Sequence, residues 1–325
     1  MKVHILDDWF DTLRDLPSFG RLKEHEVTVW TDHVEDVDML AERLADAEAL
    51  TLFRERTPIH DALLARLPRL RLISQHSVYP HVDVAACTRR GVVFCSNMVP
   101  GAPSRAAAEL TIALMLSAAR QLPAQIASLR AGTWQTGVGQ SLAGRQLGLY
   151  GYGGIGKLVA RTAEALGMNV VWWASDAGRE RARADGATVA ASRDAFFSVS
   201  DFVSLHVRQT PATMGMISAR DLRSMKPTAA FINTSRSRLV APGALLGALD
   251  AGRPGTIALD VFDTEPNLDN CDPLLAHPRV IATPHIGYVT VDELDRQFGG
   301  IYDQINAFAA GDPINVINSD VLKDG

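Results

Sequence analysis

The chain has 325 residues, more than one hydrophobic core usually holds, so its length predicts two domains. Hydrophobic residues make up 47% and charged residues 21%, a balance that is typical of globular proteins and not of disordered chains. The net charge of -5 gives no electrostatic reason to bind nucleic acid or an anionic membrane, so we expect small molecules or further copies of the chain as partners.

Strand-like runs alternate with helical patterns through the first hundred residues, which predicts a parallel sheet with helical crossovers. The predicted strands are residues 3–6, 27–30, 49–53, 70–74 and 92–94, and the predicted helices are residues 36–47, 59–66 and 82–89. No glycine fingerprint occurs in this part of the chain, so it is not the obvious place for a nucleotide.

A segment rich in Ala and Leu follows at residues 104–129, interrupted by Pro123. It is apolar around much of its circumference, which indicates burial. Burial against another domain or subunit and packing within one core are both open interpretations at this point.

The middle of the chain carries three glycines with the spacing G-x-G-x-x-G, between a predicted strand at 146–150 and a predicted helix at 155–166. The first glycine permits a tight bend, the second lets backbone approach a pyrophosphate, and the third lets the helix pack on its strand. Backbone N–H groups at the helix start would then face the phosphates. A turn that only ends the strand is the plainer alternative. In this context we predict a dinucleotide-binding turn made of Gly151, Tyr152, Gly153, Gly154, Ile155 and Gly156.

The alternation continues regularly to the end of the chain. Further strands are predicted at residues 169–173, 202–207, 229–233, 256–260 and 280–282, and further helices at 179–185, 193–199, 219–225 and 242–251. Six strands with short crossovers make a doubly wound parallel sheet. A last helix at 291–310 comes too late to add a strand, so we expect it to return to the first domain.

The cysteines Cys87, Cys95 and Cys271 are odd in number and too scattered for a disulfide framework or a metal-binding knuckle. They fit a reducing compartment. The first residues lack the charged and apolar segments of a signal peptide, and no apolar run approaches the length of a membrane span. We expect a cytoplasmic protein.

In a doubly wound sheet, ligands bind beyond the carboxyl ends of the strands, so polar residues directly after each strand are informative. Four such groups occur: His206-Val207, Asn233-Thr234-Ser235-Arg236, Asp260-Val261-Phe262-Asp263-Thr264-Glu265-Pro266 and Thr283-Pro284-His285-Ile286-Gly287.

Together with the glycine turn, these runs resemble those of the D-isomer-specific 2-hydroxyacid dehydrogenases, the family that includes glycerate, hydroxypyruvate, phosphoglycerate and formate dehydrogenases. The resemblance covers nearly the whole chain, in the family's order and spacing. It implies an α/β protein of two Rossmann-like domains. A flavodoxin-like catalytic domain would comprise residues 1–101 and 288–325, and a dinucleotide-binding domain with the doubly wound sheet residues 102–287. It also implies an NAD(H) or NADP(H) cofactor, a small 2-keto or 2-hydroxy acid substrate, no metal, and a homodimer formed through residues 104–129.

The resemblance assigns roles to three residues by position. Arg236 would bind the substrate carboxylate and polarise the carbonyl that accepts hydride, which suits the forked donors of a guanidinium. His285 would give a proton to a 2-keto acid, or take one from a 2-hydroxy acid. Glu265 would hydrogen-bond the other ring nitrogen of His285 and fix its tautomer. Taken singly, each has a plainer alternative: a surface Arg, a Glu in a turn before Pro, and a His that stabilises a turn.

The resemblance also implies the binding residues around these three. Cofactor contacts would come from Ser175, Asp176, His206, Val207, Thr213, Thr234, Ser235, Asp260 and Gly287, with Asp260 on the nicotinamide carboxamide. The substrate carboxylate would meet backbone N–H groups of the loop Gln75-His76-Ser77-Val78 after the fourth strand.

Two departures from the family's pattern bear on specificity. The loop at 75–78 is not glycine-rich, so the side chains of Gln75 and His76 could enter the substrate pocket. Ala174 stands where NAD-specific relatives have an Asp that binds the ribose hydroxyls and repels a 2′-phosphate. Arg179 and Arg181 follow closely and offer positive charge. The sequence therefore does not choose between NAD and NADP.

Competing classes fit less well. The run Gly139-Gln140-Ser141 lacks the closing glycine of a nucleophile elbow, and a hydrolase built from Ser235, His285 and Asp260 would need a coincidence. The main alternative is an NAD(H)-binding regulatory protein without metabolic turnover, as in the family's corepressor branch, which keeps the same three residues. The lack of extended disordered tails or basic segments favours the enzyme.

Overall fold

The computed structural model describes residues 1–97, 103–267 and 272–323. The chain divides into two compact units, one of Met1–Gly101 with Thr290–Gly325 and one of Ala102–Val289. The first boundary predicted from the sequence, at residue 101, lies outside the described residues. Cys271 also lies outside them, while Cys87 and Cys95 are buried free thiols.

The first unit is built on a parallel sheet with the strand order β2-β1-β3-β4-β5. This is the order of flavodoxin-like folds, as predicted. The strands are β1 (Lys2–Ile5), β2 (Glu26–Val29), β3 (Ala49–Thr51), β4 (Leu72–His76) and β5 (Val93–Asn97). Its helices are α1 (Val37–Arg43), α2 (Asp61–Leu64), α3 (Val84–Arg89) and α11 (Val291–Ala309), with short 3-10 helices η1 (Leu13–Asp15), η2 (Pro17–Leu22) and η4 (Ser319–Leu322).

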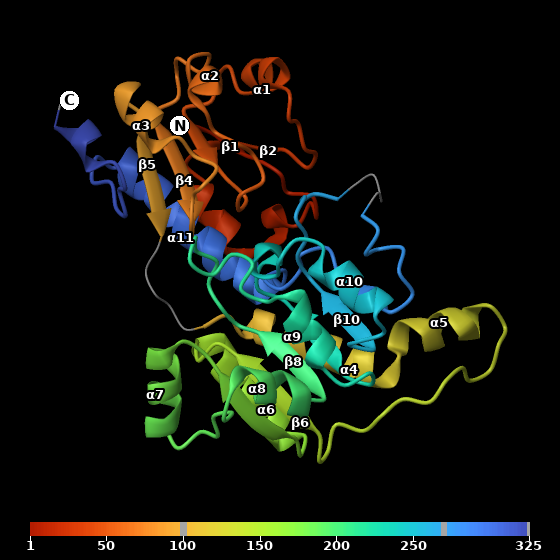
Figure 1. Cartoon of the computed structure of the whole chain (residues 1–325). Coiled ribbons are helices and arrows are strands. Elements are labelled where there is room, and N and C mark those ends of the chain that lie inside the picture. The colour runs from red at the N-terminus through yellow and green to blue at the C-terminus, as the bar shows by residue number, and fades with distance from the viewer. Residues whose placement is uncertain (98–102, 268–271, 324–325) are drawn as a thin grey trace. The chain divides into compact units, whose positions relative to one another are not determined.

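The last long helix of the chain packs on this first sheet, beside β4 and β5 (Figure 1). Ser74 of β4 donates a hydrogen bond to the carbonyl of Ile301 at 3.0 Å, and Gln304 donates one to the carbonyl of Gln75 at 3.2 Å. Both contacts join residues more than two hundred positions apart. The first unit is therefore assembled from both ends of the chain.

The second unit contains the doubly wound sheet, with the parallel strand order β11-β10-β9-β8-β6-β7. The strands are β6 (Gln146–Tyr150), β7 (Asn169–Trp173), β8 (Phe202–Leu205), β9 (Ala230–Asn233), β10 (Thr256–Leu259) and β11 (Val280–Ala282). From β6 the chain builds outward first on one side, through β7, and then on the other, through β8 to β11. The point where the order reverses, between β6 and β8, is where such sheets bind ligands.

Helices cover both faces of this second sheet. The helices of the second unit are α4 (Arg105–Arg120), α5 (Leu122–Arg130), α6 (Gly154–Ala165), α7 (Asp176–Ala184), α8 (Arg193–Val199), α9 (Ala219–Ser224) and α10 (Ala244–Asp250), with the 3-10 helix η3 (Ser237–Leu239). Of these, α5 does not lie against the sheet.

In both units, side-chain oxygens cap many helix starts by accepting backbone N–H bonds, which satisfies donors that the helix itself leaves unpaired. The capping residues are Asp36, Asp83, Ser104, Ser175, Ser192, Ser218 and Thr290.

The segment predicted as one interrupted helix at 104–129 is two helices, and the break is not at Pro123. Gln121 adopts a left-handed conformation with φ 53°, which ends α4, and Pro123 lies in the first turn of α5. Proline is tolerated in a first helical turn because the N–H that it lacks would have no intrahelical partner there. Helix α4 buries Thr111, Leu114 and Met115, whereas α5 has no buried residue and projects from the sheet (Figure 1). Core packing therefore holds for α4 alone.

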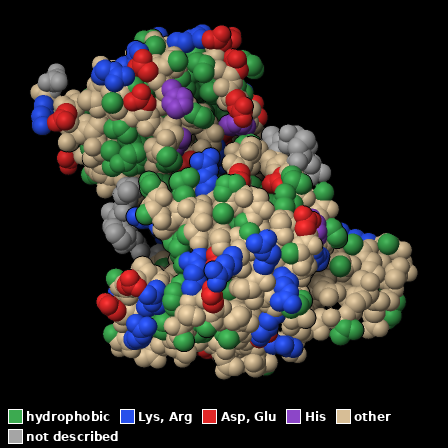
Figure 2. All heavy atoms as spheres, viewed as in Figure 1, with side chains coloured by type: hydrophobic (Ala, Val, Ile, Leu, Met, Phe, Trp, Pro, Cys, Tyr) green, Lys and Arg blue, Asp and Glu red, His purple; other side chains and the backbone are tan. Residues whose placement is uncertain are grey.

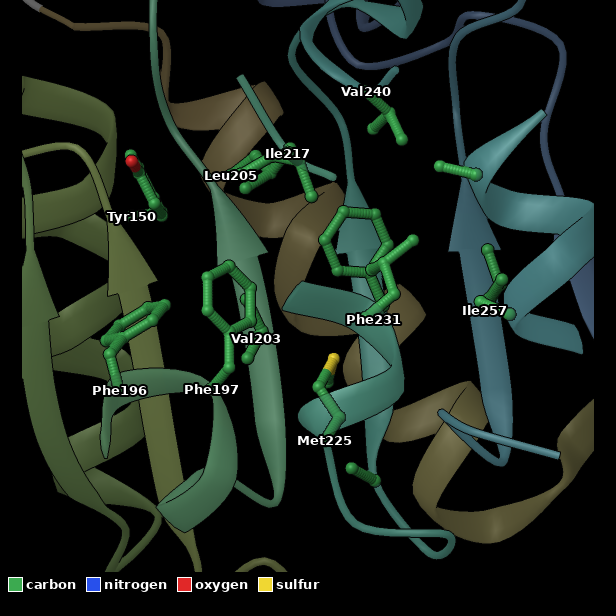
Figure 3. Close-up of a cluster of buried hydrophobic side chains, with 14 of the residues drawn as sticks. Tyr150, Phe196, Phe197, Val203, Leu205, Ile217, Met225, Phe231, Val240 and Ile257 are labelled. Atoms are coloured by element: carbon green, nitrogen blue, oxygen red, sulfur yellow. The ribbon is translucent and has the colours of Figure 1, made fainter. Parts of the chain in front are cut away.

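Two apolar layers hold the second sheet. On one face, strand residues such as Tyr150, Val203 and Phe231 meet Phe196 and Phe197 of α8 (Figure 3). On the other face, Leu114 and Met115 of α4 and Val159 and Ala163 of α6 pack against Leu147 and Leu149. Burying apolar side chains at both faces is the main favourable contribution to folding such a sheet.

Acidic and basic side chains both occur on the face shown in Figure 2, so that face does not carry charge of one sign only. Within the described residues, no helix combines the length and the apolar character needed to cross a membrane.

Candidate active site

The glycine turn joins β6 to α6, and its three glycines meet different demands. Gly151 has φ 106°, which L side chains rarely adopt, and a Cβ on it would lie 2.2 Å from the carbonyl oxygen of His206. A Cβ on Gly156 would lie 3.1 Å from the Gly151 carbonyl oxygen and 3.2 Å from the ring of Trp172. A Cβ on Gly153 would meet nothing within 4 Å. The first and third glycines therefore permit close packing, and Gly153 leaves backbone open in front of the helix.

The start of α6 fits a diphosphate. Gly153 is the N-cap residue, no side chain caps the helix there, and its first turn holds no acidic residue. The first N–H groups of a helix have no intrahelical partner, and the helix dipole adds partial positive charge at that end. The backbone of Gly153, Gly154 and Ile155 is thus suited to bind the phosphates of a dinucleotide. Tyr152 turns its hydroxyl away, to Asp185 at 2.8 Å.

An acidic and a basic side chain, Asp176 and Arg179, lie together just after the end of β7. The hydroxyl of Ser175 caps α7 by accepting the Gly178 N–H at 3.3 Å. Asp176 forms an ion pair with Arg179, whose guanidinium lies 4.3 Å from the Trp173 ring centre and donates to the Ala174 carbonyl at 2.5 Å. The Asp176 carboxylate and the Arg179 guanidinium therefore balance each other where a ribose would bind, and this edge does not distinguish NAD from NADP.

His206 and Val207 follow β8 at the reversal point of the sheet. The carbonyl of His206 and the side chain of Val207 crowd Gly151, which places both residues against the glycine turn. Burial lowers the pKa of His206 to about 4, and its Nε2 lies 3.0 Å from the Ser204 hydroxyl. A neutral imidazole therefore contributes shape here, not charge. The Thr213 hydroxyl bonds within its own loop, donating to the Arg208 carbonyl at 2.9 Å and accepting the Thr210 N–H at 2.8 Å.

The turn that carries Arg236 is held by its own side chains. Asn233 accepts the Ser235 N–H at 3.0 Å and donates to the Arg236 carbonyl at 2.9 Å. The Ser235 hydroxyl donates to the Leu205 carbonyl at 2.6 Å, and the Thr234 hydroxyl lies 2.8 Å from that of Thr111. Arg236 itself donates from Nη1 to the Ser235 carbonyl at 2.7 Å and is half-buried. This arrangement fixes the guanidinium at the carboxyl end of β9.

His285 and Glu265 come from two different strand ends and meet directly. The ring Nδ1 of His285 lies 2.5 Å from Glu265 Oε2, and the Phe262 N–H donates to Glu265 Oε1 at 2.8 Å. Burial raises the pKa of Glu265, but the hydrogen bond and charge of His285, the Phe262 N–H and the charge of Arg236 together bring it below the ordinary value. Glu265 is therefore a carboxylate that accepts from Nδ1–H of His285, so the neutral ring carries its proton on Nδ1 and not on Nε2.

Asp260 supports the loop that contains His285. The side chain is fully buried, and its carboxylate accepts from the Thr283 hydroxyl at 2.6 Å and from the N–H groups of Ile286 and Gly287, both at 2.8 Å. The resemblance implies that Asp260 contacts the nicotinamide carboxamide and that Gly287 contacts the cofactor, and both roles stay predictions. In the structure the Asp260 side chain is 0% exposed and accepts the Gly287 N–H.

The loop expected to meet the substrate carboxylate follows β4 in the first unit. Gln75, whose side chain could enter the substrate pocket, is fully buried, and its amide donates to the carbonyls of Ser77 and Val78 at 3.2 and 3.1 Å. His76 is half-buried, and burial, followed by the charges of Arg54 and Arg296, lowers its pKa to about 4. His76 is thus a neutral group.

Sequence reasoning missed two residues that shape this site, Tyr288 and Thr111. Tyr288 packs edge-on against the His285 ring, with centroids 5.6 Å apart and planes at 83°. It directly follows the run that contains His285, so its position in the sequence could have indicated it. The Thr111 hydroxyl lies 2.8 Å from that of Thr234, and no sequence signal connects these two residues across 123 positions. Thr283, which belongs to the run with His285, donates to Asp260.

A doubly wound sheet with a glycine turn at its reversal point, and an Arg, a Glu and a His after neighbouring strands, is the arrangement expected of a nicotinamide-dependent oxidoreductase. Residues 112–287 match the family described as D-isomer specific 2-hydroxyacid dehydrogenase, NAD binding domain. The chain is 33% identical to the glyoxylate reductase of Thermococcus litoralis, over 92% of each protein.

Solved structures agree with this match. The phosphoglycerate oxidoreductase from Vibrio cholerae O395 has 42% identity and a TM-score of 0.89, over 96% of this chain and 99% of that one. A protein from Ralstonia solanacearum has 43% identity and a TM-score of 0.93, over 99% and 98% of the two chains. The chain belongs to the D-isomer specific 2-hydroxyacid dehydrogenase family. It is an oxidoreductase that acts on CH–OH donors with NAD or NADP.

Proposed function

We propose that the protein interconverts a small 2-keto acid and the corresponding D-2-hydroxy acid with NAD(H) or NADP(H). Arg236 binds the substrate, and His285, oriented by Glu265, exchanges the proton. The observation that carries the proposal is the 2.5 Å contact between His285 Nδ1 and Glu265 Oε2, together with the effect of the Arg236 charge on the Glu265 pKa. That effect brings all three residues into one electrostatic group.

Each residue has a distinct part in the reduction of a keto acid. The guanidinium of Arg236 presents parallel N–H donors to the substrate carboxylate and carbonyl oxygen, which draws electron density from the carbonyl carbon. His285 gives its Nε2 proton to that oxygen as it becomes a hydroxyl, and the Glu265 carboxylate stabilises the ring while it is charged. In the reverse direction Nε2 accepts the hydroxyl proton. The bound nicotinamide supplies or accepts the hydride.

The names of the relatives suggest which keto acids to test. One is a glyoxylate reductase and others are D-3-phosphoglycerate dehydrogenases, of which Mycobacterium tuberculosis has one that is 35% identical over 88% of this chain and 54% of its own. Glyoxylate, pyruvate, hydroxypyruvate and 3-phosphohydroxypyruvate thus form a panel that runs from the smallest keto acid to a phosphorylated one. Each is tested with NADH and with NADPH by the loss of reduced-nicotinamide absorbance.

Two pairs of variants test the residue roles. Arg236→Ala should lower kcat/KM by about a thousandfold, because a lost charged bidentate contact costs several kcal/mol. Arg238→Ala, two positions on and exposed, should leave it unchanged. His285→Ala should abolish reduction while NADH still binds, whereas His60→Ala at an exposed site should not.

Unchanged turnover in His285→Ala would contradict the assigned proton transfer. NADH binding without reduction of any keto acid in the panel would overturn the proposal and favour a regulatory NAD(H)-binding protein.

A further inference from the structure

A hollow in the second unit lies beside the carboxyl ends of β9 and β10, next to residues that hold Arg236 and Glu265 in place. Its volume is about 160 Å³, and it lies between the start of α10 and the loop after β10. Apolar side chains form much of its wall: Val240, Ala241, Leu245, Leu246, Phe262 and Leu274. An apolar cavity of about this volume accommodates a ring the size of benzene.

Small residues before α10 leave room for the hollow. The helix follows Ala241-Pro242-Gly243, and a Cβ on Gly243 would meet nothing within 4 Å. Further along the helix, Ala248 and Leu249 are fully buried in the apolar layer that Figure 3 shows. Because this layer is closely packed, the helix cannot move to fill the space without opening it.

The hollow is unsuited to an anion. Among the described residues that line it, the charged side chains are both acidic: Asp263, which is exposed, and Asp272, whose Oδ1 accepts the Leu274 N–H at 2.9 Å. Two carboxylates at one hollow repel a keto acid and the phosphates of a cofactor, and they attract a cation. A cation with an apolar part matches both the carboxylates and the apolar wall.

Two residues of the wall also hold groups that are proposed to react. Asn233 donates to the Arg236 carbonyl at 2.9 Å, and the Phe262 N–H donates to Glu265 Oε1 at 2.8 Å. Both bonds belong to the arrangement in which the hollow has this shape. A ligand that binds one arrangement more tightly than others shifts the population toward it. A ligand in the hollow should therefore stabilise the positions of Arg236 and Glu265.

We propose that the hollow is a regulatory site for a small organic ammonium ion, which promotes turnover. Its apolar part lies against Leu246 and Phe262, and its charge lies at Asp263 and Asp272. It contacts neither the keto acid nor the nicotinamide. The effect on turnover rests on the proposed function, in which Arg236 and Glu265 take part, whereas the binding does not.

Benzylammonium is the probe, because its ring suits the volume and it stays charged near neutral pH. Calorimetric titration of the protein without cofactor should give a Kd on the order of 1 mM or tighter. Benzyl alcohol keeps the ring and lacks the charge, and methylammonium keeps the charge and lacks the ring. Each should bind at least about tenfold more weakly than benzylammonium.

A first pair of variants tests the place of binding. Ala241→Leu fills part of the hollow and should abolish binding of benzylammonium. Ala251→Leu, the same change at the exposed end of α10, should leave the Kd unchanged.

A second pair tests the charge and keeps the wall intact, so it decides the matter even if Ala241→Leu fails to fold. In the double variant Asp263→Asn, Asp272→Asn, an amide oxygen at position 272 can still accept the Leu274 N–H. This variant should bind benzylammonium only as weakly as the wild type binds benzyl alcohol. Asp250→Asn, at an exposed position of α10, should bind it like the wild type.

The ring of His285 reports the coupling without turnover, because it is bound to Glu265. Its NMR signals are assigned by their loss in His285→Ala. Benzylammonium should shift them in the wild type and not in Ala241→Leu. In the keto-acid assay, saturating benzylammonium should raise kcat/KM about fivefold in the wild type and leave it unchanged in Ala241→Leu. Calorimetry and NMR decide the inference even if no keto acid is reduced, so the two proposals can fail separately.

Three results would overturn the inference. One is equal affinity for benzylammonium and benzyl alcohol, since the carboxylates would then play no part. The second is wild-type affinity in Ala241→Leu, which would place the ligand elsewhere. The third is binding that changes neither the His285 signals nor kcat/KM for any keto acid that is reduced, which would remove the link to Arg236 and Glu265.

Discussion

Replacing two glycines of the β6–α6 turn by alanine should separate what the turn does for folding from what it does for binding. At Gly151 a methyl group would lie 2.2 Å from the His206 carbonyl oxygen and 2.9 Å from Val207 Cγ2, at a backbone φ of 106°. Strands β6 and β8 would have to move apart by about 1 Å to accept it. At Gly153 the same methyl group meets nothing within 4 Å, and φ is -116°.

The expected magnitudes follow from these contacts. A non-glycine residue in a sparsely populated conformation costs about 1–3 kcal/mol, and overpacking costs about 1–3 kcal/mol more. Gly151→Ala should therefore lower the free energy of unfolding of the second unit by about 2–6 kcal/mol and its melting temperature by about 5–20 °C. Gly153→Ala should leave the melting temperature within about 2 °C of the wild type. It should still weaken NADH binding at least about tenfold, because its methyl group occupies the open backbone that phosphates would approach.

Calorimetry measures the melting temperatures without cofactor, and quenching of tryptophan fluorescence measures NADH binding. The two variants together make the test specific, since only Gly153→Ala combines native stability with weak binding. If Gly153→Ala binds NADH as tightly as the wild type, the turn is not the diphosphate site, and the strand-ending alternative holds.

Three further predictions follow from the described contacts. Ala174→Asp should weaken NADPH binding at least about tenfold in fluorescence titrations and leave NADH binding unchanged, because a carboxylate at the end of β7 repels a 2′-phosphate. Equal losses of affinity for both cofactors would mean that Ala174 does not face the ribose. Helix α5 exposes the apolar side chains of Ile126 and Leu129, which are 49% and 60% exposed. The double variant Ile126→Glu, Leu129→Glu should therefore convert the expected homodimer to a monomer, as measured by light scattering. A monomeric wild type would refute the dimer. Burial lowers the pKa of His76 and His206 to about 4, so between pH 6.5 and 4 the unfolded chain binds protons that the native chain does not. The free energy of unfolding should therefore fall as pH falls through this window, by at most about 3 kcal/mol per histidine. In urea titrations His206→Asn should reduce this pH dependence.

The parts of the fold that follow local rules were predictable from the sequence. Alternating apolar runs place the strands of both sheets, and the glycine spacing identifies the β6–α6 turn, because a tight bend and close packing are requirements of single positions. The break between α4 and α5 was placed wrongly. It is set by Gln121 in a left-handed conformation, which the sequence does not indicate as a glycine would.

The candidate site also contains residues that the sequence could identify and contacts that it could not. Arg236, Glu265 and His285 could be named because they stand in runs after strands that resemble the family's motifs, and the structure brings Glu265 to His285. The hydrogen bonds of Gln75 and Asp260 could not be named from the sequence, because they depend on which way a buried polar side chain turns. A buried amide or carboxylate must find hydrogen-bond partners, and those partners are loop atoms whose positions exist only in the folded chain.

Each of the three residues proposed to react, or the loop that carries it, is held in place by hydrogen bonds. Asn233 holds the turn of Arg236, the Phe262 N–H holds Glu265, and Asp260 holds the loop of His285. All of these bonds lie within the second unit, so none of them depends on residues of the first unit. The family resemblance implies that the loop at 75–78 meets the substrate, so we expect this loop to affect which keto acid is bound. His76→Ala should then change KM between keto acids of different size much more than kcat, whereas an equal fall of kcat for all of them would place His76 in the chemistry itself.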